Sequence, residues 1–306
     1  MRTLEAWLGH VRAAGAERIW AIGAYGSNHA IATVLHARAV GLDAGAILFP
    51  QPESEWAFEN AGALIASGCR IVRLQSVALV PFAGVAIAAR DRRAIVMPPG
   101  GATPIGTLGA LSAAFELAEQ IADEHAPAPR RIVLPVGSTC TTAGLVAGFA
   151  LARAIGAWRW PVPIVHAVRV TPWPITSRIV IRQLATATLA RIAKLGGPRV
   201  ELGDPPLVVD TREFGRGYGR MTARAERALA TLAGAGRLDG VYSAKAAAAL
   251  LRLHRSYEAP LMFWSTKSDV MLPAPPHAAV AGAPRALARW LTSTEQEAQL
   301  RTVRPH

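Results

Sequence analysis

Four short turns along the chain collect the glycine, hydroxyl, amide and phenol groups that could support chemistry. They span Gly23–His29, Pro99–Gly106, Val136–Gly144 and Leu238–Lys245. Backbone N–H groups of glycine-rich turns, together with hydroxyls at the start of a helix, bind anions such as phosphate or carboxylate. Tyrosine hydroxyls can move protons or position a substrate. The four turns therefore predict a site for a small anionic ligand.

The third turn, which reads GSTCTTAG over residues 137–144, is the best candidate for an anion-binding loop. Ser138, Thr141 and Thr142 would supply hydroxyls beside the backbone N–H groups. The alternative is a tight connection from strand to helix whose hydroxyls only cap the helix, and Ser27 in the first turn has the same alternative. The chain contains neither G-x-G-x-x-G nor G-x-x-x-x-G-K-[ST]. This absence argues against a Rossmann dinucleotide site and against a P-loop.

The turns separate short apolar runs from longer helical stretches. In the first part of the chain we expect strands at 18–22, 46–49, 70–74 and 94–97 and helices at 27–40, 56–67 and 107–122. In the second part we expect strands at 131–136, 164–170 and 261–264 and helices at 142–155, 175–194, 222–233, 243–254 and near 284–291. Such alternation predicts an α/β fold with parallel sheets, in which ligands bind at the carboxyl ends of the strands.

We expect two α/β domains, a smaller one over residues 1–105 and a larger one over residues 106–306, without an internal repeat. The four turns each lie at a predicted strand end or helix start. We therefore expect residues 23–27, 100–106, 137–142 and 242–243 to converge on one cleft between the two domains.

Composition excludes several other classes of protein. Hydrophobic residues make up 51% of the 306 residues, no apolar run is long enough to span a membrane, and two cysteines cannot form a disulfide framework. The net charge is +12, but only three of the 33 basic residues are lysines and no basic run is interleaved with aromatic residues. We therefore expect a cytoplasmic protein that binds neither nucleic acid nor membrane.

The turns, in this order and spacing, resemble a known enzyme family over about residues 2 to 267. Five segments carry the resemblance. Residues 26–30 are similar to the family's S-N-H/Q helix start, and residues 100–109 to its G-G-S-x-P-L-G-x-L-G motif. Residues 215–219 are similar to G-x-G-Y-G, residues 238–245 to L-D-x-V-Y-T-x-K-A, and residues 263–266 to F-W-H-T. The family is the D-cysteine desulfhydrase and 1-aminocyclopropane-1-carboxylate deaminase branch of the fold type II, tryptophan synthase β-like enzymes that depend on pyridoxal phosphate. The resemblance implies that fold, with two parallel-sheet α/β domains and the cofactor cleft between them.

The resemblance also assigns cofactor-binding roles. Asn28 would form a hydrogen bond with the 3′-oxygen of pyridoxal phosphate, and Ser243 would face the pyridine nitrogen. The phosphate would lie against Gly137, Ser138, Thr139, Cys140, Thr141 and Thr142.

A small amino-acid substrate would bind through Ser27, His29 and the N–H groups that open their helix, because a helix N-terminus favours a carboxylate. Tyr242 and Tyr218 would transfer protons or position the substrate. The alternative for either tyrosine is a buried aromatic ring whose hydroxyl has one partner. For Lys245 we expect a structural salt bridge rather than catalysis.

The phosphate loop departs from the family's pattern G-S-G-G-T-x-A-G. Thr139 and Cys140 replace the two inner glycines. Glycine adopts positive φ and lets the backbone approach a phosphate closely, whereas β-branched Thr139 would be strained in that conformation. We expect an altered loop with altered affinity for the cofactor.

A second departure concerns the lysine that forms a Schiff base with the cofactor. The family carries this lysine in the motif G-N-K-x-R-K-L-E. Here Arg2–Glu5 matches R-K-L-E, so Met1 aligns with the x. The lysine would therefore lie one residue before Met1. Lys194, Lys245 and Lys267 lie in no matching segment. Either the start was assigned at an internal methionine, which we favour, or the gene is degraded.

The expected function is pyridoxal-phosphate-dependent β-elimination of a D-cysteine-like amino acid, or a related deamination, by a homodimer. The alternative is a non-catalytic remnant that binds phosphate or pyridoxal phosphate, or that acts as a partner subunit.

Overall fold

The computed structural model describes residues 2–256, 260–266, 268, 270–272, 275 and 277–293. Contacts divide the chain into two compact units. Unit 1 contains Met1–Trp7 and Gly101–Ser268, and unit 2 contains Leu8–Gly100 and Asp269–His306. Helix α1 (Arg2–Ala13) passes from the first unit into the second.

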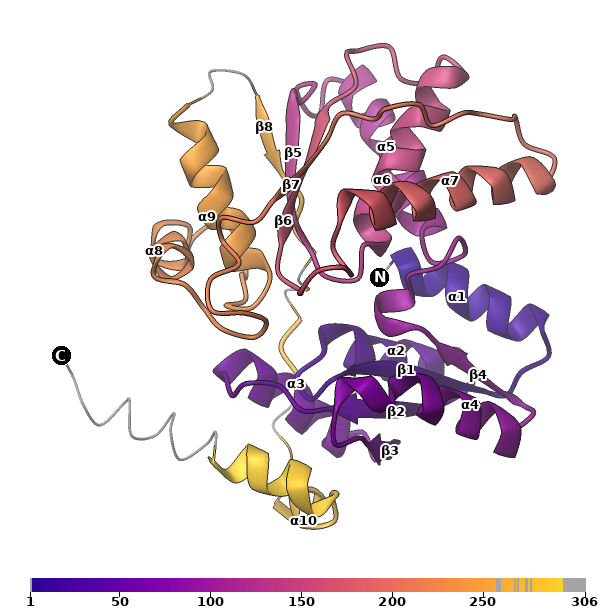
Figure 1. Ribbon diagram of the computed structural model, residues 1–306, viewed down its shortest axis with the longest axis vertical. Helices are drawn as coiled ribbons and strands as arrows, with labels where there is room; N and C mark the ends of the chain where they lie inside the picture. The colour runs from indigo at the N-terminus through magenta and orange to yellow at the C-terminus, as the bar shows by residue number, and fades with distance from the viewer. Residues whose placement is uncertain are drawn as a thin grey trace. The chain divides into compact units, whose positions relative to one another are not determined.

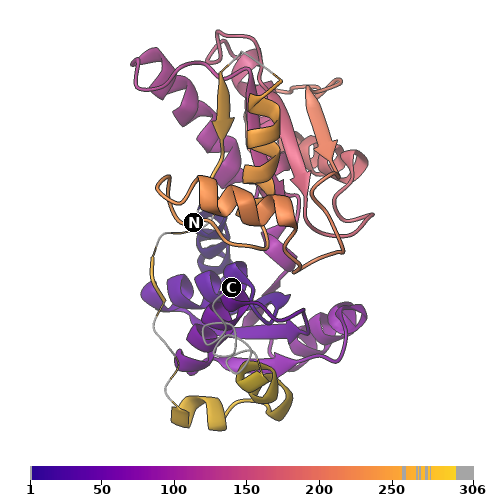
Figure 2. The same ribbon diagram turned by 90° about the vertical axis from the view of Figure 1, so that its left-hand side faces the viewer.

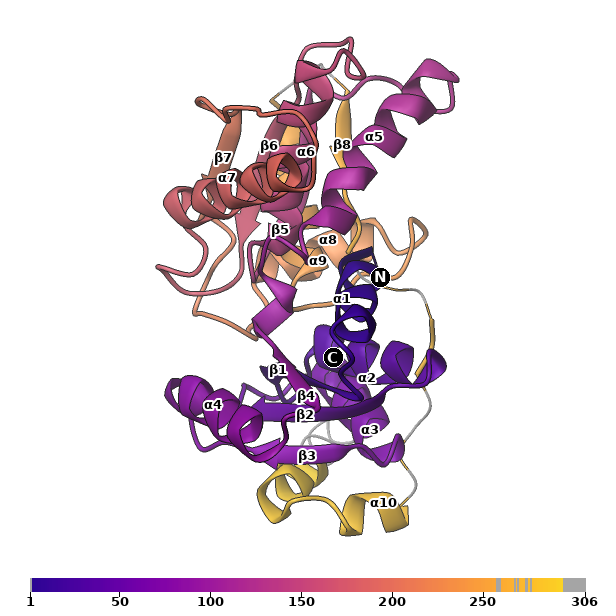
Figure 3. The ribbon, with the colours of Figure 1, turned by 90° about the vertical axis from the view of Figure 1, so that its right-hand side faces the viewer.

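Unit 2 is built on a four-stranded parallel sheet in the order β3-β2-β1-β4. Its strands are β1 (Arg18–Ala24), β2 (Asp43–Phe49), β3 (Arg70–Arg73) and β4 (Ala94–Met97). Helices α2 (Asn28–Ala39) and α3 (Glu55–Ala66) connect β1 to β2 and β2 to β3, and η1 (Val77–Leu79) and α4 (Val80–Arg90) lead back to β4. Because parallel crossovers are right-handed, α2 and α3 cover one face of this sheet and α4 covers the other, as Figure 3 shows.

The face below α4 holds a core of Trp20, Ile22, Ile47 and Leu74, against which Ile87 and neighbouring α4 side chains pack. On α4 itself, the side chains of Phe82 and Val85 are about 70% exposed. On the opposite face, alanine-rich α2 packs closely on β1 and β2, and α3 packs against α2.

Unit 1 contains a second four-stranded parallel sheet, in the order β7-β6-β5-β8. Its strands are β5 (Arg131–Val136), β6 (Ile164–Arg169), β7 (Leu207–Asp210) and β8 (Leu261–Phe263). Figure 1 shows α5 (Leu108–Ala122), α6 (Cys140–Ala154) and α7 (Arg178–Lys194) on one face of this sheet. Helix α9 (Ser243–His254) packs on the other face, and α8 (Ala223–Thr231) packs against α9; Figure 2 views the sheet from their side.

The core of unit 1 lies mainly between its sheet and α5, α6 and α7. Gly144 and Gly148 allow α5 and α6 to approach closely, because a Cβ at these positions would lie within 2.6 Å of the carbonyl oxygens of Thr107 and Leu111. A smaller cluster of Val133, Val168 and α9 residues fills the opposite face. This packing fixes the carboxyl end of β5 against the N-termini of α6 and α9.

These two sheets confirm the predicted α/β class with parallel strands. Among the described α-helices and strands, α1, α4, α10 (His277–Ala281) and β7 have no counterpart among the predicted ones. Helix α4 is apolar around its circumference and therefore lacks a helical period, and β7 is only four residues long. No helix in the described part of the chain is long and apolar enough to cross a membrane.

The two units differ from the predicted division at residue 105. Their boundary falls at η2 (Pro99–Gly101), between Gly100 and Gly101. The C-terminal segment, with α10 (His277–Ala281) and a helix over 285–293, belongs to unit 2 instead of the larger domain. The Trp290 indole donates to the Gln51 carbonyl at 3.1 Å and its ring packs edge-on against Tyr25. At the other terminus, Arg2 pairs with Glu116 of α5 and thereby joins unit 1.

Candidate functional site

The predicted anion-binding loop follows β5 and ends in the first turn of α6. Thr139 adopts φ +71° and ψ −15°, the left-handed conformation in which a β-branched residue is strained, as the sequence predicts. Its side chain makes no capping hydrogen bond at the N-terminus of α6. The Thr142 hydroxyl is buried and has no hydrogen-bond partner in the described part of the chain. The loop therefore presents a helix N-terminus and an unpaired hydroxyl, both suited to an anion.

Cys140 does not share the positive φ of Thr139, although both replace glycines of the family's motif. It is the first residue of α6. Its thiol contacts the Gly101 carbonyl at 3.4 Å and the Thr3 hydroxyl at 3.9 Å. Burial raises the pKa of this thiol to about 12, so it stays protonated. The contact with Gly101 brings the second predicted turn against the third.

The fourth turn meets the third at Tyr242. A Cβ at Gly137 would lie 2.9 Å from Cε1 of the Tyr242 ring, so glycine is required for this approach. The hydroxyl of Tyr242 lies 2.8 Å from that of Tyr218, and the two rings pack edge to face. Burial raises the pKa of Tyr218 and raises that of Tyr242 well above its ordinary value. Both phenols therefore keep their protons near neutral pH, and each hydroxyl has a partner in the other.

Ser243 begins α9 and is completely buried. Its hydroxyl donates to the Asp239 carboxylate at 2.8 Å. The same carboxylate accepts from the backbone N–H groups of Val241 and Tyr242 at 3.0 and 2.7 Å. Asp239 thus orders the turn that carries Tyr242 and Ser243. Sequence reasoning did not single it out, although an aspartate just before a helix is a typical cap.

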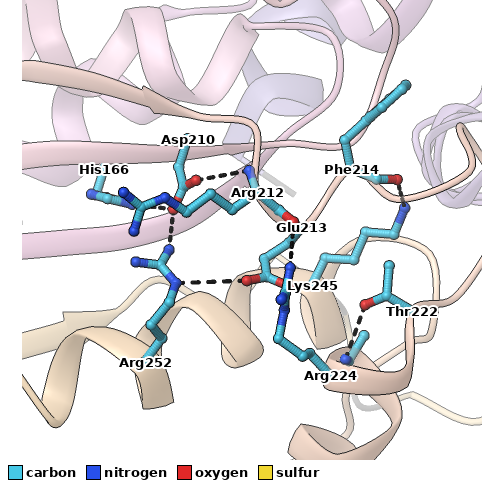
Figure 4. Close-up of polar contacts among 10 residues, drawn as sticks. His166, Asp210, Arg212, Glu213, Phe214, Thr222, Arg224, Lys245 and Arg252 are labelled. Carbon is cyan, nitrogen blue, oxygen red and sulfur yellow. Dashed lines mark hydrogen bonds and ion pairs between the residues drawn. The ribbon is translucent and has the colours of Figure 1, made fainter.

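Lys245 lies in the first turn of α9 and its side chain is completely inaccessible to solvent. Its ammonium donates to the carbonyls of Phe214 and Gly217 at 2.9 and 3.3 Å, the first of which Figure 4 shows. Burial lowers the pKa of Lys245 to about 8, with the Glu213 charge opposing the shift. The expected salt bridge is therefore replaced by backbone contacts, which anchor the segment next to Tyr218.

A network of charged groups, centred on buried His166, Asp210 and Glu213, supports the same segment (Figure 4). His166 accepts from Arg131 and contacts Asp210, both at 2.9 Å, and Arg252 also pairs with Asp210. Burial acts to raise the pKa of Asp210, but the hydrogen bond from His166, a backbone N–H and the Arg252 charge together hold it well below its ordinary value. Glu213 extends the network to Arg224 at 2.9 Å.

The first predicted turn belongs to unit 2. Ser27 is the N-cap of α2, and its hydroxyl accepts from the Ala30 N–H at 3.2 Å. Asn28 accepts through Oδ1 from the side-chain amide of Asn60 at 2.8 Å. Burial lowers the pKa of His29 to about 4, so its ring is neutral at pH 7, and its Nε2 has no partner in the described part of the chain.

The structure thus brings together Tyr218, Tyr242, Ser243 and the loop over 137–142 within unit 1, and Ser27, Asn28 and His29 at the start of α2 in unit 2. Lys267 lies outside the described residues. Asn60, which contacts Asn28, was not predicted to take part, and Asp239 lies in a predicted turn but was given no role of its own.

The chain is similar to known proteins over most of its length. Nocardicin C-9′ epimerase of Nocardia uniformis subsp. tsuyamanensis is 32% identical over 296 residues, which cover 90% of this chain and 84% of that protein. A putative 1-aminocyclopropane-1-carboxylate deaminase of Pyrococcus furiosus is 29% identical over 270 residues, covering 84% and 75% of the two chains.

Among solved structures, one described as an ACC deaminase homologue superposes with a TM-score of 0.71 at 26% identity, covering 96% of this chain and 83% of that chain. A fungal L-serine ammonia-lyase from Rhizomucor miehei shares the fold, with a TM-score of 0.54 at 18% identity, covering 88% and 84%. The family described as pyridoxal-phosphate dependent enzyme matches residues 1–263. The chain therefore belongs to this family, with its tryptophan synthase β-like fold and pyridoxal phosphate as its cofactor.

Proposed function

We propose that the protein acts on a small amino acid and removes its β-substituent or its amino group, releasing ammonia. The observation that carries this proposal is the contact between the anion-binding loop and the hydrogen-bonded Tyr218–Tyr242 pair in unit 1. The similarity to putative deaminases over most of the chain supports the same class of reaction.

The residues present fit pyridoxal phosphate. A helix N-terminus without a capping bond from Thr139 and the unpaired Thr142 hydroxyl are donors that a phosphate would satisfy. We propose that this loop holds the phosphate through Gly137, Ser138, Thr139, Cys140, Thr141 and Thr142. Ser243 would lie at the pyridine nitrogen while its hydroxyl remains held by Asp239. Asn28 would donate to the 3′-oxygen.

The bound cofactor supplies an electron sink for the bonds at the substrate's Cα. The chain's own groups then orient the substrate and manage protons. Ser27 and the first N–H groups of α2 would hold the carboxylate, and neutral His29 would offer its Nε2, which has no partner among the described residues. Because both phenols keep their protons, the Tyr218–Tyr242 pair would act as a proton donor to the leaving group.

Lys245 is not suited to form a Schiff base. Its nitrogen is committed to two carbonyl oxygens and is closed to solvent. We therefore expect borohydride treatment of the chain with pyridoxal phosphate, followed by peptide mapping, to leave Lys245 unlabelled. Stoichiometric labelling of Lys245 would contradict its assignment as a structural lysine.

The activity test measures the products released from candidate substrates. Purified protein with pyridoxal phosphate is incubated with the D and L forms of cysteine and serine, and ammonia and keto acid are measured. We expect the wild type to release ammonia and keto acid from at least one of these substrates. In Tyr242→Phe we expect a large loss of this rate and an unchanged affinity for the cofactor. Cofactor binding without any turnover would favour the non-catalytic alternative. Light scattering of the same sample tests the homodimer that the family resemblance favours.

Epimerisation at Cα is the second candidate, because the epimerase is similar to 90% of this chain. Both reactions break the Cα–H bond, but epimerisation returns a proton and releases no ammonia. Incubation in deuterated water separates them, since an epimerase incorporates deuterium at Cα of both stereoisomers while the amino acid remains intact.

A further inference from the structure

Asn60 is a buried amide on α3, and its side chain reaches the turn that carries Ser27, Asn28 and His29. It is 2% exposed. Its Nδ2 donates to the Gly26 carbonyl at 2.9 Å and to Asn28 Oδ1 at 2.8 Å. All of these residues belong to unit 2.

The two contacts together fix the orientation of both amides. A backbone carbonyl only accepts, so the Asn60 atom facing Gly26 must be the nitrogen. The same nitrogen faces Asn28, so the Asn28 atom must be the oxygen. The NH₂ group of Asn28 is then at the end of its amide that points away from Asn60.

Helix α3 is held firmly against this turn. A Cβ at Gly26 would lie 2.2 Å from the Ala57 Cα, so only glycine permits the contact. Ser54 caps α3 by accepting from the Ala57 N–H at 3.3 Å. Asn60 follows Ala57 by three residues and therefore extends from the same face of the helix.

We propose that Asn60 is a positioning residue that holds the Asn28 amide with its NH₂ donor toward the cofactor. The inference rests on the proposed function, because the partner of that donor is the 3′-oxygen of pyridoxal phosphate. An ionised 3′-oxygen only accepts hydrogen bonds. A reversed Asn28 amide would present an oxygen to it and lose the bond.

The test is Asn60→Asp, which keeps the shape but replaces the donor with a carboxylate. Asn28 then turns its NH₂ toward the carboxylate and away from the cofactor. Tryptophan fluorescence, with eight tryptophans as reporters, measures the dissociation constant of pyridoxal phosphate. We expect it to rise about tenfold or more, the effect of losing a hydrogen bond to a charged group.

The matched ligand is 3-deoxypyridoxal 5′-phosphate, which carries the same phosphate but lacks the 3′-oxygen. The wild type and Asn60→Asp should bind this ligand equally well, apart from any loss of affinity that a less stable α3 causes. Ser54→Ala measures that loss. Ser54→Ala weakens the same helix without touching Asn60, so it measures the effect of a less stable α3. Asn60→Ala removes both donors without adding charge and should show the same selective loss.

Equal losses for both ligands in Asn60→Asp and Asn60→Ala would overturn the positioning role. Failure of the wild type to bind pyridoxal phosphate would overturn the proposed function itself, and the inference with it. The two failures are therefore distinguished by the wild-type titration alone.

Discussion

Thr139 shows how one side chain changes an anion-binding loop. A β-branched residue in the left-handed region costs about 1–2 kcal/mol, which packing around the nearly buried side chain must offset. Cys140, the second replacement of a glycine, carries no such strain because it is already helical. The altered motif is thus one strained position beside one ordinary helical residue.

Lys245 is a second residue whose environment predicts a measurable effect. Its pKa falls from an ordinary 10.5 to about 8 in the folded protein, so between these pH values the unfolded chain binds more protons. Stability therefore rises with pH across this window, by at most about 3 kcal/mol. Urea unfolding should show that the advantage of the wild type over Lys245→Met grows as pH increases from 8 to 10.5.

At neutral pH, Lys245→Met should already destabilise the protein by about 1–3 kcal/mol, because two buried carbonyls lose their donor. Lys194, exposed at the end of α7, provides the control. Lys194→Met should change neither the stability nor its pH dependence. A constant difference between the wild type and Lys245→Met at all pH values would refute the depressed pKa.

At the scale of elements, two features meet at the N-terminus of α6. Its N-cap residue, Thr139, makes no side-chain capping bond, and the buried Thr142 hydroxyl has no partner in the part of the chain that the structure describes. Such a feature lowers the stability of the protein alone and favours a ligand that satisfies it. Helix α9 differs, because Asp239 accepts from its first two N–H groups: the Ser243 N–H donates to the carboxylate at 3.3 Å and the Ala244 N–H to the carbonyl at 2.9 Å. The two helix N-termini that meet at Gly137 and Tyr242 therefore have different roles. The N-terminus of α6 is available to bind an anion, and that of α9 is a rigid support.

Thr142→Val tests this interpretation of α6. Removing an unsatisfied buried hydroxyl should raise the free energy of unfolding without cofactor by about 1 kcal/mol. If the hydroxyl binds the phosphate, the dissociation constant of pyridoxal phosphate should rise about tenfold. Urea unfolding and fluorescence titration measure the two quantities.

Thr188→Val is the matched control, because the Thr188 hydroxyl is equally buried but lies 2.7 Å from that of Thr107. It should lower the stability and leave cofactor affinity unchanged. If Thr142→Val also leaves affinity unchanged, the hydroxyl has no part in phosphate binding.

At the scale of the whole molecule, both units have the same strand order, with two strands added on one side of the first and the last strand on the other. The sequence contains no internal repeat from which this shared strand order could be predicted. The C-terminal segment completes unit 2, where Leu287 and Leu291 are buried and Trp290 contacts Gln51.

Leu287→Ala should therefore destabilise unit 2 by about 2–5 kcal/mol, the usual effect of truncating a fully buried leucine. Hydrogen exchange should accelerate in β1, β2 and β3 and remain unchanged in β5, β6 and β7. Thr292→Ala, at an exposed position of the same helix, should have little effect. Loss of protection in β5–β7 would show that the segment stabilises unit 1 instead.

The sequence by itself determined most of the strands, the parallel α/β class and the turns that carry polar groups. These features depend on local patterns: β5 is a mostly apolar run that ends just before Gly137, and α2 begins just after the capping residue Ser27. The order of the motifs also led to the family and its cofactor, because their combined spacing is far more specific than any single turn.

Only the tertiary structure decided which partners those groups have. Asn60 reaches Asn28 across 32 residues of sequence, and Lys245 reaches Phe214 across 31. Trp290 reaches Gln51 across 239 residues, which places the C-terminal segment in unit 2. Hydrogen bonds and packing between distant segments leave no local pattern, since they depend on how strands and helices meet in space. The same physical reason applies to the two residues that replace glycines in the loop. Only the structure, with the turn placed against α5 and α9, shows that Thr139 is strained and that Cys140 is an ordinary helical residue.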